Sequence, residues 1–451
     1  WAESVIFAGI RQGKGYLRYY DKLGSIQGKK FDEPTVLLVG EVKGDEDIPE
    51  GVTAVITPDA VDLVSHVAVR VRNAGVLFAT CYDSSIVSQL KSKENSFVGA
   101  HLRGSGDVVI DSLSEQDSCL QTHCLNTSEI TVGKKTFSSY ALLLDEVSPE
   151  TAGGKSVHSK ELKEGLPQWI ETPKSIVIPF GVFEKVVKEQ GKEGLFQNLL
   201  AKLTTDPDTN PKLLETLSRD LSFHEGVVSA VQSKMTDAGF SESFDPQALW
   251  KSIKGVWASV WSKRAVESRR VFGFPDDAIS MAVLVQEVIP AEYAFVIHTV
   301  NPSTGKKDEL FAEVVPGLGE TLVGSHAGRA FGFLSNKKKS SCKVVSFPSK
   351  SYSLKGSGII CRSDSSAEDL SSYSGAGVYD SILLSPPKKH LNEYVKDPLI
   401  ADPAFRESVV QKITGIGNIV EKYFKAPQDI EGVYAQGKWY VVQARPQAGV
   451  N

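Results

Sequence analysis

The sequence predicts a multidomain protein of α/β and α+β class, with a small β/α domain followed by a larger α+β domain. Its 451 residues, 41% apolar and 23% charged, are enough for two or three hydrophobic cores. Short β-rich runs come first, helical periodicity dominates from about 140 to 275, and strand-like runs follow. We therefore expect domains over 1–112 and 140–451, a linker at 113–139, and a helical subdomain at about 180–275.

The first domain is expected from short β-rich runs between Gly, Pro and Asp turns. These runs are Thr35–Val39, Val52–Thr57, Val76–Thr80 and Val108–Ile110. After the second run, Ser65 and His66 open a segment in which Val67, Val69 and Val71 alternate with other residues, as in a strand. Because Gly75 is well placed to end a helix, we predict a short helix with His66 in its first turn.

His66 suits a phosphohistidine carrier. The first turn of a helix lies at the positive end of the dipole, where free backbone N–H groups hold a phosphate. An imidazole is largely neutral near pH 7 and can attack phosphorus. The alternative, from the spacing alone, is a hydrogen-bonded histidine at a helix cap.

Composition excludes several classes of function. A net charge of −5 with no basic domain argues against a nucleic-acid partner, and no window is apolar for long enough to span a membrane. Five scattered cysteines give neither a disulfide framework nor zinc-ligand spacing, which favours a reducing compartment. The chain begins at Trp1 without a targeting segment, so we expect a fragment or a processed form.

The middle of the chain reads as a linker followed by helices. Residues 113–135 are polar without a sustained period, which predicts flexibility. Helices are expected at Val182–Glu189, Gly194–Leu203, Lys212–Leu221 and Pro246–Arg270. Three tryptophans of the last helix could bind sugar, but their spacing favours a buried stripe; they are Trp250, Trp257 and Trp261.

Strands are expected beyond residue 275, and the chain closes on a hairpin. The expected strands are Met281–Val288, Ala294–Val300, Glu309–Val315, Ile359–Arg362, Ile430–Tyr434 and Trp439–Ala444. In the hairpin, Glu431 and Gln443 could face the same side and share a metal ion, with Arg445 beside them. A hairpin without such a role is the alternative.

Two glycine-rich segments offer phosphate contacts, because glycine lets backbone N–H groups approach closely. One is Gly153-Gly154-Lys155, where Lys155 would reach the phosphate. The other places Arg362 at the end of a strand before a Ser- and Gly-rich loop that runs to Gly377. Ordinary surface turns are the alternative for both.

Two parts of the sequence resemble a known enzyme group. The blocks Leu63–Arg72 and Phe78–Cys81 resemble the phosphohistidine signature of the alpha-glucan water dikinases, relatives of pyruvate phosphate dikinase and phosphoenolpyruvate synthase. Further segments resemble the ATP-grasp-type domain of that group. They are Leu284–Ile289, Asn301–Gly305, Gly317–Glu320, the Arg362 block and Gln443–Pro446.

The resemblance implies a swivelling phosphohistidine domain followed by an ATP-grasp-like nucleotide-binding domain. It implies ATP as a substrate and Mg²⁺ as a cofactor, with His66 catalytic and with Glu431 and Gln443 as metal ligands. The implied nucleotide-binding residues are Lys155, Gln286, Glu287, Val288, Glu320, Arg362 and Arg445. A segment around Arg264 also matches, but no role is assigned to it.

Chain order favours the dikinases within this group, since the histidine domain precedes the nucleotide domain and no pyruvate-binding barrel follows. The resemblance then implies transfer of the β-phosphate of ATP through His66 to a glucosyl hydroxyl of starch-like α-glucan, at carbon 6, with the γ-phosphate going to water. The alternatives are carbon 3 of phosphoglucan, another acceptor, or a non-catalytic glucan-associated scaffold. The resemblance implies a plastid location, and the oligomeric state is left open.

Overall fold

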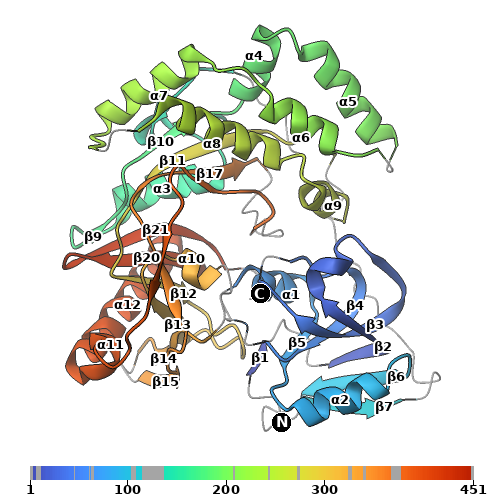
Figure 1. Ribbon diagram of the computed structural model, residues 1–451. Coiled ribbons are helices and arrows are strands. Elements are labelled where there is room, and N and C mark those ends of the chain that lie inside the picture. Colours follow the sequence, from blue (N-terminus) through green and yellow to red (C-terminus); the bar gives the residue numbers. More distant parts are fainter. Residues whose placement is uncertain are drawn as a thin grey trace.

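The computed structural model in Figure 1 describes most of the chain. The described residues are 4–6, 12–44, 46–59, 61, 65–102, 108–113, 137–206, 209–241, 244–271, 275–323, 328–338, 342–366 and 377–447. Most of the predicted linker and most of the loop after Arg362 lie outside them. We refer to the described residues of 4–113 as the first unit and to those of 137–447 as the second unit; the predicted domain bounds stay a prediction.

The first unit is built on a seven-stranded sheet, in the order β1-β5-β4-β3-β2-β6-β7. Its strands are β1 (Ser4–Ile6), β2 (Gln12–Lys22), β3 (Lys30–Glu41), β4 (Glu50–Thr57), β5 (Leu77–Thr80), β6 (Phe97–Leu102) and β7 (Val108–Ser112). The four strands from β2 to β5 are parallel. The predicted β-rich runs correspond to β3, β4, β5 and β7 of this sheet, although β5 begins one residue after Val76.

Alternation along these strands fills both faces of the sheet. Leu37 and Phe78 pack with Val67 and Val71 of α1 (His66–Ala74) on one face. Leu38 and neighbouring residues pack with Leu90 of α2 (Ser84–Ser92) on the other. Parallel strands buried on both faces are expected to be rich in apolar residues throughout, as these are.

The second unit contains two larger antiparallel sheets and one pair of strands. The five-stranded sheet has the order β18 (Ile382–Leu383), β17 (Gly358–Ser365), β11 (Met281–Val288), β10 (Ser175–Ile178), β8 (Leu142–Leu143). The seven-stranded sheet has the order β15 (Cys342–Ser346), β14 (Phe331–Asn336), β13 (Glu309–Pro316), β12 (Tyr293–His298), β20 (Gln428–Ala435), β21 (Lys438–Pro446), β9 (Ile170–Glu171), where β9 alone is parallel to its neighbour. The pair is β16 (Tyr352–Lys355) with β19 (Lys388–Leu391).

A helical layer covers one face of the five-stranded sheet, at the top of Figure 1. Its helices are α4 (Val182–Glu189), α5 (Glu193–Thr205), α6 (Lys212–Arg219), α7 (Glu225–Asp237), α8 (Pro246–Ser259) and α9 (Lys263–Val271). The remaining helices are α3 (Gly154–Gly165), α10 (Glu320–Val323), α11 (Pro398–Ala401) and α12 (Pro403–Phe424). The three tryptophans are buried in the core of this layer, which confirms the predicted stripe.

The structure divides one expected helix and contains a long helix that was not expected. The helix predicted over Pro246–Arg270 is interrupted, because the hydroxyl of Ser262 accepts a hydrogen bond from the Ala265 N–H and starts a new helix there. Strands dominate beyond residue 275, as expected, but α12 was not predicted; its apolar residues pack on one face of the seven-stranded sheet. Among the described residues, none of the helices is long and apolar enough to cross a membrane.

Candidate active site

His66 is the first residue of α1, at the carboxyl edge of the parallel sheet, after β4 and a short connection. This confirms the predicted helix, and Gly75 adopts the positive φ of 64° that ends it. The expectation of free N–H groups in the first turn is wrong for two of them. The Val67 N–H donates to the Gly44 carbonyl at 2.9 Å, and the Ala68 N–H donates to the Ser65 hydroxyl at 3.4 Å.

Side chains and backbone from both units surround the imidazole. Arg70, one helical turn after His66, is buried and pairs with Asp47 at 3.1 Å. From the second unit, Gly377 approaches so closely that a Cβ built on it would lie 2.5 Å from Nη2 of Arg70 and 2.7 Å from Nδ1 of His66. The two side chains therefore converge at a point that a glycine leaves open.

The electrostatic environment keeps the His66 ring neutral. Burial, followed by the positive charges of Arg70, Arg445 and Arg264, lowers the pKa of His66 to about 3 against the opposing effect of Asp429. A neutral imidazole has a lone pair on nitrogen and can act as a nucleophile. The same three arginines could later balance the charge of a phosphoryl group.

The lowered pKa predicts how His66 titrates. An imidazole with the ordinary pKa of about 6.5 becomes protonated between about pH 8 and pH 5. In the arrangement described, we expect the His66 imidazole to stay neutral over this whole range. Because a separated imidazole would bind a proton in that range and this one does not, contact between the units should weaken as pH falls below about 6.5. An NMR titration of the ring, assigned with His66→Ala, measures this. A transition between pH 6 and 7 in the nucleotide-free protein would contradict the arrangement.

The closing hairpin brings three predicted site residues, together with Asp429, onto one face. Glu431 of β20 pairs with Gln443 of β21, and two residues along, Asp429 pairs with Arg445. A bulge leaves Val442 unpaired between Gln443 and Val441. Residues directly opposite on antiparallel strands share a face, and a bulge re-aims the side chains beside it.

Arg362 connects this hairpin to the five-stranded sheet. Its Nη1 donates to Oε1 of Gln286 at 3.2 Å, while its Nη2 donates to Oε2 of Glu431 at 3.1 Å and to Oε1 of Gln443 at 2.6 Å. Gln286 lies on β11 and Arg362 on β17, so the guanidinium lies where the two sheets of the second unit meet. The structure thus brings four of the predicted site residues into one cluster.

Arg445 is held beside that cluster and close to His66. Its Nε and Nη2 donate to Oδ2 of Asp429 at 3.0 and 2.7 Å, and His298 lies 3.6 Å from the other carboxylate oxygen. All three side chains are buried. The carboxylate fixes the guanidinium in one orientation, and both charges act on His66.

Lys155 is fixed at the end of β17, next to Arg362. It lies in the first turn of α3, and its ammonium donates to the carbonyl oxygen and hydroxyl of Ser363 at 2.8 and 3.2 Å. The buried carboxylate of Asp364 accepts hydrogen bonds from the N–H groups of Gly153 and Lys155 at 2.9 Å each. The Gly-Gly-Lys turn and the Arg362 strand therefore form one structure.

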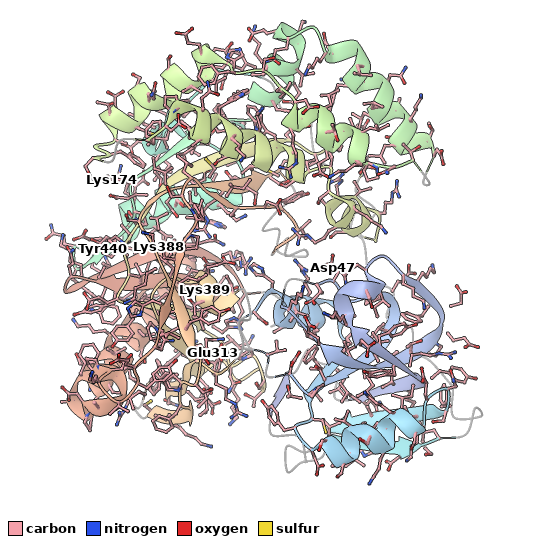
Figure 2. The ribbon with its side chains drawn as sticks, viewed as in Figure 1. Asp47, Lys174, Glu313, Lys388, Lys389 and Tyr440 are labelled. Atoms are coloured by element: carbon pink, nitrogen blue, oxygen red, sulfur yellow. The ribbon has the colours of Figure 1, made fainter. Side chains whose placement is uncertain are left out.

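The other predicted nucleotide-binding residues lie at the end of β11 and at the start of α10. Glu287 is the penultimate residue of β11, and its Oε1 lies 3.9 Å from Nζ of Lys174, which Figure 2 labels at the same side of the molecule as Tyr440. Val288 is partly buried against an apolar cluster of the seven-stranded sheet. Glu320 opens α10 and is exposed. Their roles stay predictions.

Asp429 and Glu313 were not among the residues predicted from the sequence, and Arg264 was named there without a role. Asp429 is two residues from Glu431 on one strand, so alternation alone would have placed the two side chains together. Glu313, labelled in Figure 2, is buried on β13 in the same register row as Glu431, with Val296 between them. Arg264 on α9 donates to the Val378 carbonyl at 3.2 Å, a contact 114 residues away that no local pattern could have predicted.

The oxygen atoms of Glu431 and Gln443 fit a hard cation such as Mg²⁺. Both approach the same nitrogen of Arg362, so they converge on one region. Mg²⁺ prefers oxygen ligands and takes only one or two from the protein beside substrate phosphates. Within the described ranges, no group of three or more His, Cys, Asp or Glu is arranged to hold a metal ion.

Two family models match the chain. Residues 4–119 match the phosphohistidine-like domain of alpha-glucan water dikinase. Residues 243–358 match the AMP/ATP-binding domain of pyruvate phosphate dikinase. The first match contains His66, and the second contains Gln286, Glu287, Val288 and Glu320.

Curated relatives agree with these matches. The chain is 42% identical over 448 residues to the chloroplastic alpha-glucan water dikinase of Solanum tuberosum, covering 96% of this chain and 30% of that protein. It is 41% identical over 449 residues to the chloroplastic alpha-glucan water dikinase 1 of Arabidopsis thaliana, covering 96% of this chain and 32% of that protein. A probable phosphoenolpyruvate synthase of Methanocaldococcus jannaschii is 26% identical over 344 residues, covering 67% of this chain and 26% of that protein.

The chain spans about a third of the length of the dikinases that it matches. The aligned region covers 96% of this chain, so it includes both the unit that carries His66 and the unit that carries Arg362. Phosphoenolpyruvate synthases are more distant relatives. The chain belongs to the family of the alpha-glucan water dikinases.

Proposed function

We propose that this chain transfers the β-phosphoryl group of ATP to His66 and from there to a glucosyl hydroxyl of a starch-like α-glucan. One observation carries the proposal. The neutral ring of His66 lies between the units, with Arg70 on its own helix and with Arg264 and Arg445 on the nucleotide-binding side. A nucleophile surrounded by cations is what attack on a polyphosphate requires.

Different residues of the second unit would bind the phosphates and the adenine of ATP. Arg362, Lys155 and Arg445 would bind phosphate oxygens, and Arg362 would exchange its contacts with Glu431 and Gln443 for the nucleotide. Gln286, Glu287 and Val288 would line the adenine site, and Glu320 would lie near the nucleotide. Because phosphoryl transfer depends mainly on positioning and charge, fixed cations are the main requirement.

The proposed reaction breaks two bonds of ATP. A ring nitrogen of His66 displaces AMP from the β-phosphorus, and water takes the γ-phosphoryl group as inorganic phosphate. The glucan hydroxyl then attacks the phosphorus on His66, losing its proton to solvent and returning the imidazole to its neutral form. Each turnover gives one AMP, one phosphate and one phosphorylated glucosyl unit.

Glu431 and Gln443 would hold Mg²⁺ together with the phosphate oxygens. The ion would neutralise charge that develops on the bridging oxygens. With the metal bound there, Arg362 would be free to contact phosphate instead.

The acceptor and the location rest on the relatives. Two of them are named as alpha-glucan water dikinases and as chloroplastic. We propose an α-glucan acceptor, phosphorylated at carbon 6, and a plastid location. The His66 unit would have to move between ATP and a polymer, so residues 113–139 would serve as its swivelling linker.

A chase experiment tests the acceptor. The chain is loaded with β-labelled ATP and Mg²⁺, freed of nucleotide, and mixed with soluble amylopectin; His66→Ala is the control. We expect the label to leave the wild-type protein for glucan, and NMR of the product to place it on carbon 6. Label that stays on His66 in the presence of glucan would refute the proposed acceptor, and label on carbon 3 would refute the position.

A further inference from the structure

The charges around His66 divide into two sets. Arg264, Arg445 and Asp429 belong to the second unit, while Arg70 is on the same helix as His66. If the first unit carries phosphohistidine from one site to another, the second-unit charges stay behind. Any group that stabilises the phosphoryl group during the second transfer must move with α1.

Backbone donors in the first turn of α1 are poorly placed for this role. The Val67 N–H is bonded to Gly44, and the Ala68 N–H is bonded to Ser65, as described above. A phosphoryl group on His66 therefore finds the N–H groups most often used at a helix terminus already engaged. Side-chain charge must supply what these donors do not.

Arg70 is placed to supply this charge. Its Nη2 and the Nδ1 of His66 both lie less than 3 Å from the point where Gly377 has no side chain. Residues four apart on a helix lie one above the other, so the guanidinium stays next to the ring wherever the helix goes. Arginine also offers a planar pair of donors that matches phosphate oxygens.

The carboxylate of Asp47 pairs with that guanidinium, and hydrogen bonds to Gln27 fix the backbone of Asp47. Its backbone N–H donates to the side-chain oxygen of Gln27 at 2.8 Å, and its carbonyl accepts from the Gln27 amide at 3.0 Å. The carboxylate of Glu46 accepts from the N–H groups of Lys43 and Gly44 and fixes the rest of the loop. Figure 2 labels Asp47 beside α1, on the side of the first unit nearer to the second.

We propose that Arg70 is a catalytic residue of both transfers, binding the phosphoryl group on His66 and travelling with it from ATP to the acceptor. This rests on the proposed function. Arg362 and Gly377, in contrast, belong to the second unit and should act in the ATP step alone.

The test separates the two transfers. Wild type, Arg70→Met, Arg70→Lys and the matched control Arg18→Met, an arginine of the same unit at its surface, are compared. Phosphorylation of His66 is followed from β-labelled ATP. The second transfer is followed from His66 loaded chemically with phosphoramidate, with soluble amylopectin as acceptor and His66→Ala to subtract label on other histidines.

We expect Arg70→Met to slow both transfers by roughly 100-fold, the lower end of the loss that removal of one donor at a developing negative charge causes. Arg70→Lys should recover part of each rate, and Arg18→Met should match wild type. Folded Arg70→Met that passes phosphate to glucan at the wild-type rate would overturn the inference. Wild type that takes no β-label, or passes none to glucan, would instead refute the proposed function.

A measurement on the wild-type protein keeps the inference testable if Arg70→Met does not fold. The guanidinium ¹⁵N signal that is missing in Arg70→Lys should shift when phosphoramidate loads His66 in the absence of nucleotide. It should not shift in His66→Ala. An unchanged signal in loaded wild type would show that Arg70 does not contact the phosphoryl group.

Discussion

Replacing Arg362 with methionine is expected to slow phosphorylation of His66 by ATP about 100- to 1,000-fold, the usual loss for a charged donor at a reacting phosphate or oxyanion. Arg362 contacts Gln286 on one sheet and Glu431 and Gln443 on the other, so it occupies the junction where a nucleotide would be clamped. Methionine has a similar length but no charge. Arg362→Lys should restore little, since an ammonium lacks the planar fork.

The Arg362→Met protein should remain folded, because Glu431 is partly exposed and can be solvated when its partner is lost. Arg219→Met is the matched control, since the exposed side chain of Arg219 on α6 pairs with Glu215 at 3.1 Å. Single-turnover rates with β-labelled ATP and thermal melting curves decide the outcome. A normal rate in Arg362→Met would remove Arg362 from the phosphate site.

Gly377→Ala is expected to slow the ATP step by about 100-fold and to leave glucan phosphorylation from preloaded His66 unchanged. The added methyl group would lie within 3 Å of the imidazole and of the Arg70 guanidinium. The guanidinium is the end of a flexible side chain and can yield, whereas the ring has less freedom. A displacement of about 1 Å can cost 100-fold in rate when reacting groups are pre-positioned.

The control for this variant must separate contact from backbone strain. Gly377 has φ of 65°, so alanine is strained there in any case. Gly191 has φ of 68° and nothing within 4 Å of its built Cβ, so Gly191→Ala carries the same strain without the contact. If both variants form phosphohistidine equally fast, the approach of Gly377 to His66 has no part in the ATP step.

Much of the fold follows from local patterns in the sequence. The apolar run Met281–Val288 predicted β11 to the residue, and the two strands of the closing hairpin were predicted to within about two residues at each end. The cap residues around His66 outweighed the valine alternation, and α1 begins at His66 as predicted. The missed helix α12 has buried residues at helical spacing, such as Val409, Ile413 and Ile416, so its signal was present.

The site was harder to predict from the sequence than the fold, because its contacts join distant parts of the chain. Pairing of Glu431 with Gln443 follows from hairpin register. That Arg362 would reach both, or that Asp364 would hold the Gly153 turn from 211 residues away, depends on how two sheets meet. The approach of Gly377 to His66 likewise depends on how the two units meet, for which a local sequence pattern carries no signal.

The most direct test of the central claim uses the chain with Mg²⁺ and ATP labelled at either the β or the γ phosphorus, without glucan. Peptide mapping under alkaline conditions, where phosphohistidine survives, locates the label. The account predicts β-label on His66, γ-label released as inorganic phosphate, and no label in His66→Ala. Label on His66 from the γ position, or β-label on another residue of a folded protein, would contradict it.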